Sequence, residues 1–190
     1  MASIRHNDGV LDAARDCVLA YGVRRTTLTD VARRAGVSRM TLYRRWPDVR
    51  TLVADLMTRE WVRVLAGLDA AADPVRAVVE GVRALRAHPL WRKIVETDPD
   101  LLLPYLLDRR GATHEAVLEL LEPVVGDARR ARAVLLVAQS FLLSAPTMTG
   151  PATGAPAGPG TVTLDELDAE LAALLEAYLG QLAQRRPPLT

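Results

Sequence analysis

Residues 27–50, TLTDVARRAGVSRMTLYRRWPDVR, constrain the fold of this chain more than any other stretch. Thr27 and Ser38 each stand where a side-chain oxygen can cap the amino terminus of a helix. Gly36 lies between the two predicted helices, where the chain must turn sharply, and glycine adopts a positive φ without steric cost. The spacing therefore predicts two short helices joined by a tight turn, with Leu42 buried on the second helix.

The remaining side chains of the second helix, residues 39–45, are predicted to face outward and suit contact with a DNA duplex. Arginine can donate two hydrogen bonds to guanine, and threonine or methionine can meet a thymine methyl group. We therefore interpret the motif as a helix-turn-helix whose second helix enters the major groove. Base contacts are expected from Arg39, Met40, Thr41 and Arg44. A basic helical face that is merely solvated remains the alternative.

Over about residues 10–55 the motif resembles the DNA-binding head of the TetR family of repressors. The resemblance rests on Thr26-Thr27, Val31-Ala32, Ala35-Gly36-Val37-Ser38, Thr41-Leu42-Tyr43 and Trp46-Pro47-Asp48. It departs at Val18, Met40 and Val49, where phenylalanine, glycine and lysine are common. The resemblance implies phosphate contacts from Tyr43 and Thr27, with Arg45 and Arg50 as added candidates.

The rest of the chain is predicted to be helical, because Ala, Leu and Arg dominate and no run of alternating β-branched residues occurs. We expect helices at 9–21, 47–68, 74–87, 90–97, 112–125, 128–144 and 164–183, two short pieces or a kink at 99–107, a loose arm at 1–8 and a non-helical loop at 146–160. The fold class is therefore all-α.

Charge divides the chain into a basic and an acidic part. Residues 1–50 hold ten arginines and five aspartates, whereas the remaining residues hold 14 basic and 18 acidic side chains. This asymmetry is expected if only the first part meets phosphates. We predict a helix-turn-helix DNA-binding domain at 1–50 and a larger helical domain at 51–190, which the resemblance implies binds an effector and dimerises.

Dimerisation is expected at the two most apolar helical stretches, residues 131–143 and 167–182. The resemblance implies that the last two long helices form a four-helix interface with their copies, so that a homodimer reads a palindromic operator on double-stranded DNA. The expected interface residues are Val134, Leu135, Ala138, Leu142, Leu171, Leu174, Leu175 and Tyr178. A purely monomeric core is the alternative for both helices.

The resemblance also implies a pocket for a small-molecule effector within the larger domain. Large side chains in the corresponding region are Trp61, Trp91, Tyr105 and Phe141, each of which could instead be core. Few charges in this domain look buried, so an apolar or aromatic effector is expected.

Other features exclude several classes of protein. Cys17 is the single cysteine and cannot form an intrachain disulfide, which suits a reducing compartment. No signal peptide is visible, and no apolar segment is expected to approach the length of a membrane span. The three histidines show no metal-binding spacing, and neither a cofactor nor an enzyme activity is expected.

Together these observations predict a cytoplasmic transcriptional repressor that leaves its operator when an effector binds. Two other functions stay open. One is a ligand-independent architectural DNA-binding protein. The other is a protein-binding module whose helix-turn-helix has lost DNA binding, with Met40 and Val49 as signs of decay.

Overall fold

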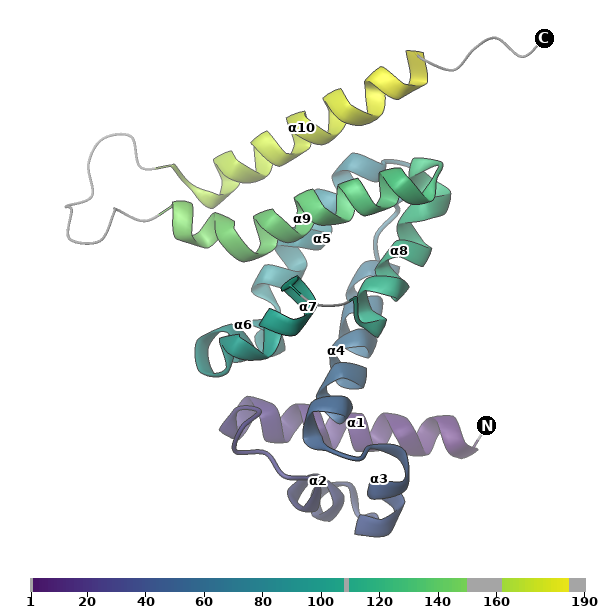
Figure 1. Cartoon of the computed structure of the whole chain (residues 1–190), viewed down its shortest axis with the longest axis vertical. Coiled ribbons are helices and arrows are strands. Elements are labelled where there is room, and N and C mark those ends of the chain that lie inside the picture. The colour runs from purple at the N-terminus through teal and green to yellow at the C-terminus, as the bar shows by residue number, and fades with distance from the viewer. Residues whose placement is uncertain (1, 108–109, 150–161, 185–190) are drawn as a thin grey trace, which may run out of the picture. The chain divides into compact units, whose positions relative to one another are not determined.

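The computed structural model describes residues 2–107, 110–149 and 162–184, with the side chains of 2–7, 105, 107 and 181–184 excepted (Figure 1). These residues contain helices and no strand, which confirms the all-α prediction. The elements are α1 (Ala2–Tyr21), α2 (Leu28–Ala35), α3 (Arg39–Arg45), α4 (Val49–Ala66), α5 (Pro74–Ala87), α6 (Pro89–Thr97), the 3-10 helix η1 (Pro99–Leu102), α7 (Leu103–Leu107), α8 (Ala112–Val125), α9 (Ala128–Met148) and α10 (Leu164–Gln184).

The helices form two compact units, and the chain passes between them more than once. The first unit comprises the chain up to Arg63 together with Ala87–Ala116, and the second comprises Val64–Arg86 together with the chain from Val117. The first unit thus joins the amino-terminal helices to α6 and α7. The predicted division into domains 1–50 and 51–190 stays a prediction.

The first unit is built around an apolar core contributed by helices α1 to α4 and α6. Helix α1 packs against α2 and α6, and α2 packs against α3. Each of these five helices contributes at least one fully buried side chain to the core: Val10, Val18, Val31, Leu42, Leu52, Leu56 and Leu90. Burying each of these leucine or valine side chains contributes roughly 1.5–3 kcal/mol, so the core holds the short helices α2 and α3 in place.

Helix α1 begins earlier than the sequence suggests. It starts at Ala2, so the predicted loose arm at 1–8 is wrong for residues 2–8. Tertiary contacts explain part of the difference, because Arg59 of α4 donates to the main-chain carbonyl oxygen of Asp8 at 3.0 Å. The guanidinium group of Arg59 also lies 2.8 Å from the carboxylate of Asp12.

Helix α4 begins two residues later than predicted. Pro47 and Asp48 precede the helix, and Asp48 accepts a 2.7 Å hydrogen bond from the N–H of Thr51. That bond, with a second one from the Thr51 hydroxyl, holds the pKa of Asp48 below its usual range. Asp48 is therefore the capping residue of α4 and does not lie in its first turn.

The second unit contains α9 and α10, which pack against each other. Asp168 of α10 is buried and binds two arginines of α5, Arg83 at 2.7 Å and Arg86 at 2.6 Å. These ion pairs tie α10 to α5. Thr163 and Glu166 form a reciprocal cap at the start of α10, with the N–H of Thr163 donating to Glu166 at 2.7 Å.

Helix α9 is longer than predicted and continues through Pro146 to Met148. The expected non-helical stretch at 146–160 is therefore wrong for 146–148, and residues 150–160 lie outside the described part of the chain. Leu142 and Ala145 are buried just before the proline, so packing against the unit continues to the last turns of the helix.

Helix α9 is also apolar enough by length and composition to cross a bilayer. It has 21 residues, with a mean hydropathy of 1.3 over its most apolar window, and 22% of that window is buried. The expectation that no apolar segment approaches this length is wrong for α9. The low buried fraction means that much of an apolar helix is uncovered in the single chain.

Candidate nucleic-acid interface

The turn between α2 and α3 has the predicted geometry. The Thr27 hydroxyl oxygen accepts from the N–H of Asp30 at 3.1 Å and caps α2. Gly36 has a φ of 66° and a ψ of 29°, in the left-handed region that favours glycine. The Ser38 hydroxyl oxygen accepts from the N–H of Thr41 at 3.1 Å and caps α3. Local hydrogen bonds therefore fix where each of these helices begins.

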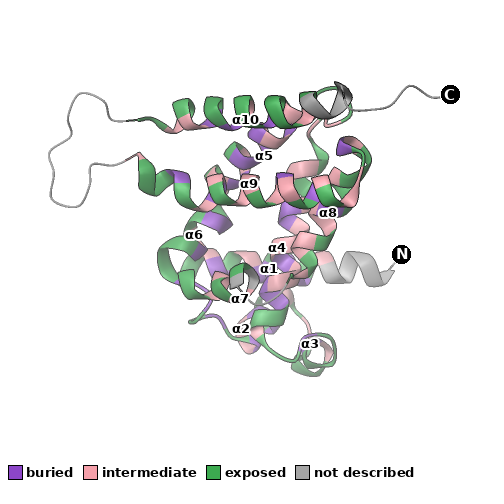
Figure 2. Cartoon of the chain, turned by 45° about the horizontal axis from the view of Figure 1, so that its top comes forward, coloured by how far each residue is buried: buried purple, intermediate pink, exposed green. Residues whose placement is uncertain are grey.

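Helix α3 is attached to the first unit through a single fully buried side chain, Leu42. Its other faces are largely exposed (Figure 2). Met40 is 79% exposed and Tyr43 is also exposed, although both carry large apolar groups. Arg39, Arg44 and Arg45 are exposed, and Thr41 is half-buried. The eight predicted DNA contacts are completed by Thr27 and Arg50, which are exposed as well.

The carboxyl end of α3 is fixed by Trp46. The Trp46 ring is buried, and its Nε1–H donates to the Asp55 carboxylate of α4 at 2.8 Å. The guanidinium carbon of Arg45 lies 5.0 Å from the centre of the same ring, within the range of a cation–π contact. Asp55 was not among the predicted functional residues. Its place two turns into α4 was the available signal, but only the fold shows that it meets Trp46.

The arginines of the helix-turn-helix fall into two groups. Arg33 pairs with Asp30 at 2.8 Å, and Arg34 pairs with Asp16 at 3.0 Å. By contrast, a set of exposed arginines has no acidic partner among the residues with described side chains: Arg25, Arg39, Arg44, Arg45 and Arg50. Four of this set were predicted to contact DNA, and Arg25 was not. Uncompensated positive charge on an exposed surface attracts the phosphate backbone.

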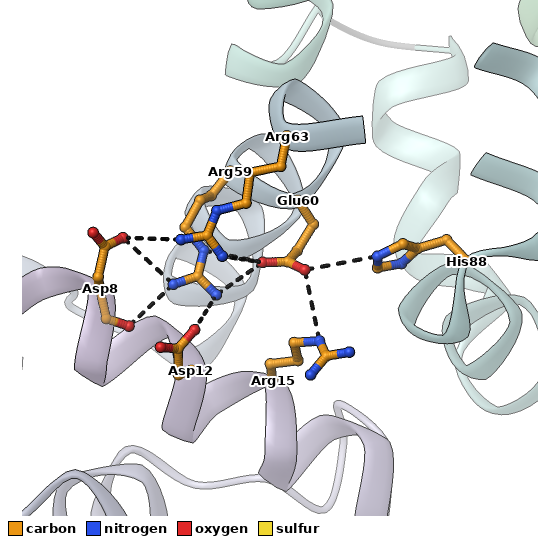
Figure 3. A network of polar contacts seen from close by, with 7 residues as sticks. All are labelled: Asp8, Asp12, Arg15, Arg59, Glu60, Arg63 and His88. Carbon is orange, nitrogen blue, oxygen red and sulfur yellow. Dashed lines mark hydrogen bonds and ion pairs between the residues drawn. The ribbon is translucent and has the colours of Figure 1, made fainter. Parts of the chain in front are cut away.

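A buried carboxylate on α4 organises the helices that support this surface (Figure 3). Glu60 accepts from Arg59 at 3.0 Å and from Arg63 at 3.2 Å, and it lies 3.6 Å from Arg15 of α1. Because Arg59 also binds Asp8 and Asp12, the network joins α1 to α4 through several charged contacts. A carboxylate removed from water requires such partners.

The ring of His88, at the amino end of α6, completes the network on the other side of Glu60. Its Nε2 atom lies 3.7 Å from the carboxylate. Burial lowers the pKa of His88, and the positive charge of Arg15 lowers it further, while Glu60 acts in the opposite direction. The ring also packs edge-on against Trp61, with centroids 5.5 Å apart.

The structure brings together only part of the predicted effector pocket. Trp61 and Trp91 are buried in the first unit with their ring centroids 5.9 Å apart. Phe141 is half-buried and belongs to the second unit. Tyr105 lies in α7, and its side chain is outside the described part of the structure.

Among the described side chains beyond residue 50, few charged groups are buried, as expected, and these few are carboxylates. Glu60, Asp98 and Asp168 are all buried. An arginine pairs with each of these carboxylates and permits its burial. Because the sequence does not show these pairs, it does not show that the carboxylates are buried.

The predicted interface residues of α9 and α10 separate into two sets. Val134, Leu142, Leu171 and Leu175 are buried within the single chain, so they form the core between the two helices. Leu174 and Tyr178 are exposed, and Leu135 and Ala138 are half-buried. Leu136, which was not predicted, is the most exposed leucine among the described side chains of these two helices, at 69%.

Comparison with known proteins agrees with this geometry. Residues 10–56 match the family model described as bacterial regulatory proteins, tetR family. An uncharacterized HTH-type transcriptional regulator of Mycobacterium tuberculosis is 38% identical over 152 residues, which is 72% of this chain and 79% of the relative.

Solved structures show the same fold. The TetR family repressor AlkX from a Dietzia strain, implicated in biodegradation of n-alkanes, superposes with a TM-score of 0.63 at 23% identity, covering 92% of this chain and 95% of AlkX. A complex of SmeT with triclosan gives a TM-score of 0.54 at 20% identity, covering 92% of this chain and 91% of SmeT.

Three observations support one assignment: the capped turn at Gly36, the exposed basic helix α3 and the extended similarity to a regulator. This chain belongs to the TetR family of bacterial transcriptional regulators and carries the family's DNA-binding helix-turn-helix at its amino-terminal end.

Proposed function

We propose that this protein is a repressor that binds a palindromic operator as a homodimer and is released from it by a small-molecule effector. The observation that carries the proposal is the exposed face of α3, where charged and apolar side chains project from a helix whose one fully buried side chain is Leu42. Large exposed apolar groups on a small helix favour a surface that becomes covered by a partner.

Within each half-site, we assign base contacts to Arg39, Met40, Thr41 and Arg44. Arginine recognises guanine through O6 and N7, and the methionine methyl group suits thymine. Phosphate contacts are assigned to a second set, which holds the helix in register: Thr27, Tyr43, Arg45 and Arg50. Lysine is common in the family at the position of Val49, and Arg50 supplies the phosphate contact here instead.

The dimer contact is assigned to α9 and α10. Exposed apolar side chains of these helices include Leu136, Leu174 and Tyr178, and Leu135 and Ala138 are half-buried. A two-fold axis brings the same surface of each protomer together, which buries both copies at once. This narrower set replaces the eight residues expected from sequence, since four of those already form the core of one chain.

We assign the effector to the class of apolar or aromatic small molecules. Triclosan in the SmeT complex and the association of AlkX with n-alkane degradation support this class. Within this proposal, Trp61 and Trp91, which are buried with their ring centroids 5.9 Å apart, are assigned to the aromatic part of the effector site. Release requires that the effector bind one arrangement of the dimer better than the DNA-bound arrangement, and the coupling is reciprocal. A protein of this function acts in the cytoplasm, where the chromosome lies.

Selection from random duplexes tests the proposal. The purified full chain is mixed with random duplexes at physiological salt, and bound duplexes are sequenced after several rounds. We expect an inverted repeat whose half-sites are spaced by about one helical turn, near 10 base pairs from centre to centre. Enrichment of bent or A·T-rich DNA without a repeat would instead identify an architectural protein. No enrichment at all would favour the protein-binding module.

A further inference from the structure

Asp98 is a buried carboxylate that lies at the carboxyl end of α6 and binds the turn between α1 and α2. Its side chain is 2% exposed. It accepts from the backbone N–H of Val23 at 2.8 Å and from that of Arg24 at 3.4 Å, across 75 and 74 residues of sequence. The Nε atom of Arg24 lies 3.5 Å from the same carboxylate. A segment distant in sequence thus supplies the acceptor for two amides of this turn.

The turn itself leaves those two amides without an acceptor inside α1. The N–H of Gly22 still donates to Val18 at 2.8 Å, which ends α1, and Gly22 has a φ of 80°. Farther along, the Thr26 hydroxyl donates to the Gly22 carbonyl oxygen at 2.7 Å, and the Thr26 N–H donates to the Val23 carbonyl oxygen at 3.1 Å. Asp98 therefore accepts from the two N–H groups of the turn that have no acceptor in α1, those of Val23 and Arg24. The turn ends at Thr26, and the next residue, Thr27, caps α2.

The fit between the turn and α6 is close. A Cβ atom added at Gly22 would lie 3.0 Å from the Oδ2 atom of Asp98 and 3.0 Å from the hydroxyl oxygen of Thr97. The Thr97 hydroxyl lies 2.8 Å both from that Oδ2 atom and from the Lys93 carbonyl oxygen, and it can donate to one of them at a time. The carboxylate has no room to move toward Gly22, so it fixes the position of the turn.

We propose that Asp98 is a positioning residue for DNA recognition: it holds the turn that places α2, and through α2 places α3, for contact with the duplex. The proposal rests on the proposed function, because it concerns recognition of a specific site. In this role Asp98 itself does not contact DNA and acts through the turn, by the backbone N–H groups of Val23 and Arg24 and the side chain of Arg24. Charge-assisted hydrogen bonds to backbone amides are stronger and more directional than neutral ones, which suits a positioning role.

Asp100 provides a matched control. It also pairs with Arg24, at 2.7 Å, but its side chain is 46% exposed. No hydrogen bond joins it to the backbone of the turn among the described residues. Replacing Asp100 by asparagine removes an ion pair to the same arginine and leaves the turn amides satisfied.

The test compares Asp98→Asn, Asp98→Ala and Asp100→Asn with the wild type. Asparagine keeps one acceptor oxygen, which can still serve Val23, but its amide group then faces the Arg24 N–H. Affinity is measured for the duplex recovered by selection with the wild type and for an unrelated duplex of equal length, at one salt concentration. Temperatures are kept well below each variant's melting point, and circular dichroism verifies that the variants are folded.

We expect Asp98→Ala to weaken binding of the selected duplex on the order of tenfold or more, Asp98→Asn to lie between it and the wild type, and Asp100→Asn to bind as the wild type does. Affinity for the unrelated duplex should change little, because it depends on phosphate electrostatics. A merely structural role would leave the ratio of the two affinities unchanged, and that result would overturn the proposal.

Hydrogen exchange of the free protein supplies a readout that needs no DNA. In Asp98→Ala, the amides of Val23 and Arg24 should exchange faster, while those of α4 keep their protection. If the wild type selects no duplex, the proposed function fails. If the wild type selects a duplex and the Asp98 variants bind it with unchanged preference, only this inference fails.

Discussion

The exposed side chains of α3 differ in what each can contribute to recognition. Arg39 is the first residue after the Ser38 cap, at the end of the helix that approaches base edges first in this kind of motif. It has no acidic partner within the described chain, so its guanidinium group is available to a base. Met40 beside it is almost fully exposed and supplies an apolar contact.

Replacing Arg39 by alanine should weaken binding of the selected duplex by about 1–3 kcal/mol and relax the preference at one position of each half-site. The reason is the loss of a two-bond contact to guanine. Electrophoretic mobility shift with the selected duplex and its single-base variants measures both effects. Arg76→Ala is the control, because Arg76 is an exposed arginine of α5 paired with Glu80. Equal affinity of Arg39→Ala and the wild type would remove Arg39 from the recognition surface.

At the scale of elements, two glycines with positive φ end α1 and α2 and differ in their surroundings. An added Cβ atom at Gly36 would have no atom within 4 Å, whereas at Gly22 it would meet Asp98 and Thr97 at 3.0 Å. Gly36 is therefore required for its backbone conformation alone. Gly22 is required for its conformation and also for close approach to α6.

Substitution to alanine should separate these two requirements. Gly36→Ala should lower the free energy of unfolding by about 1–2 kcal/mol, the usual cost of the left-handed conformation. Gly22→Ala should lower it by more, since the Asp98 carboxylate must also shift. Urea denaturation followed by circular dichroism measures both. If both variants lowered the free energy of unfolding by the same amount, the close contact of Gly22 with α6 would make no contribution to stability.

Most element boundaries could be predicted, and the two largest misses, at the start of α1 and the end of α9, have one cause. The predicted caps at Thr27 and Ser38 are confirmed, because each accepts from an N–H three residues along the chain. The start of α1 and the end of α9 instead coincide with tertiary contacts, namely the bond of Arg59 to Asp8 and the burial of Leu142 and Ala145. Such contacts override local preference.

At the scale of the whole molecule, the apolar surface of α9 supports the proposed dimer. Helix α9 is long and apolar, yet only 22% of its apolar window is fully buried in one chain. An uncovered face of this kind on a protein in water favours a second copy.

Introducing a charge at the centre of this face should separate the protomers. Leu136→Glu should give a particle of monomer mass by light scattering at micromolar concentration, while the wild type gives twice that mass, because the charge would be buried in the interface. Leu103→Glu is the control, since Leu103 is an exposed leucine of α7 in the other unit. A wild-type protein of monomer mass would refute the dimer.

Global stability should respond to His88 when the pH falls below neutrality. Burial lowers the pKa of His88 in the folded state, whereas the unfolded chain has the ordinary value of about 6.5. As the pH falls through the unfolded value toward the lower folded value, the unfolded chain takes up the proton first. The free energy of unfolding therefore decreases with falling pH over this window.

The comparison of wild type with His88→Gln isolates this contribution, because carboxylates titrate in both proteins. The stability of the wild type relative to the variant should decline as the pH is lowered through the window and then level off below the folded pKa. Urea denaturation at a series of pH values measures it. A difference that stayed constant with pH would show that His88 does not lose stability by protonation.

The sequence by itself determined the all-α class, the helix-turn-helix and the exposed face of its second helix. Those features follow from periodicity and from hydrogen bonds within a few residues, such as that between Ser38 and Thr41. Only the tertiary structure decided the contacts of Asp98 with Val23 and of Asp168 with Arg83, which span 75 and 85 residues. A carboxylate on a helix has the same kind of neighbours in the sequence whether its side chain is exposed to water or buried. The arginine or amide that permits its burial comes from a distant segment, and only the folded chain brings the two together.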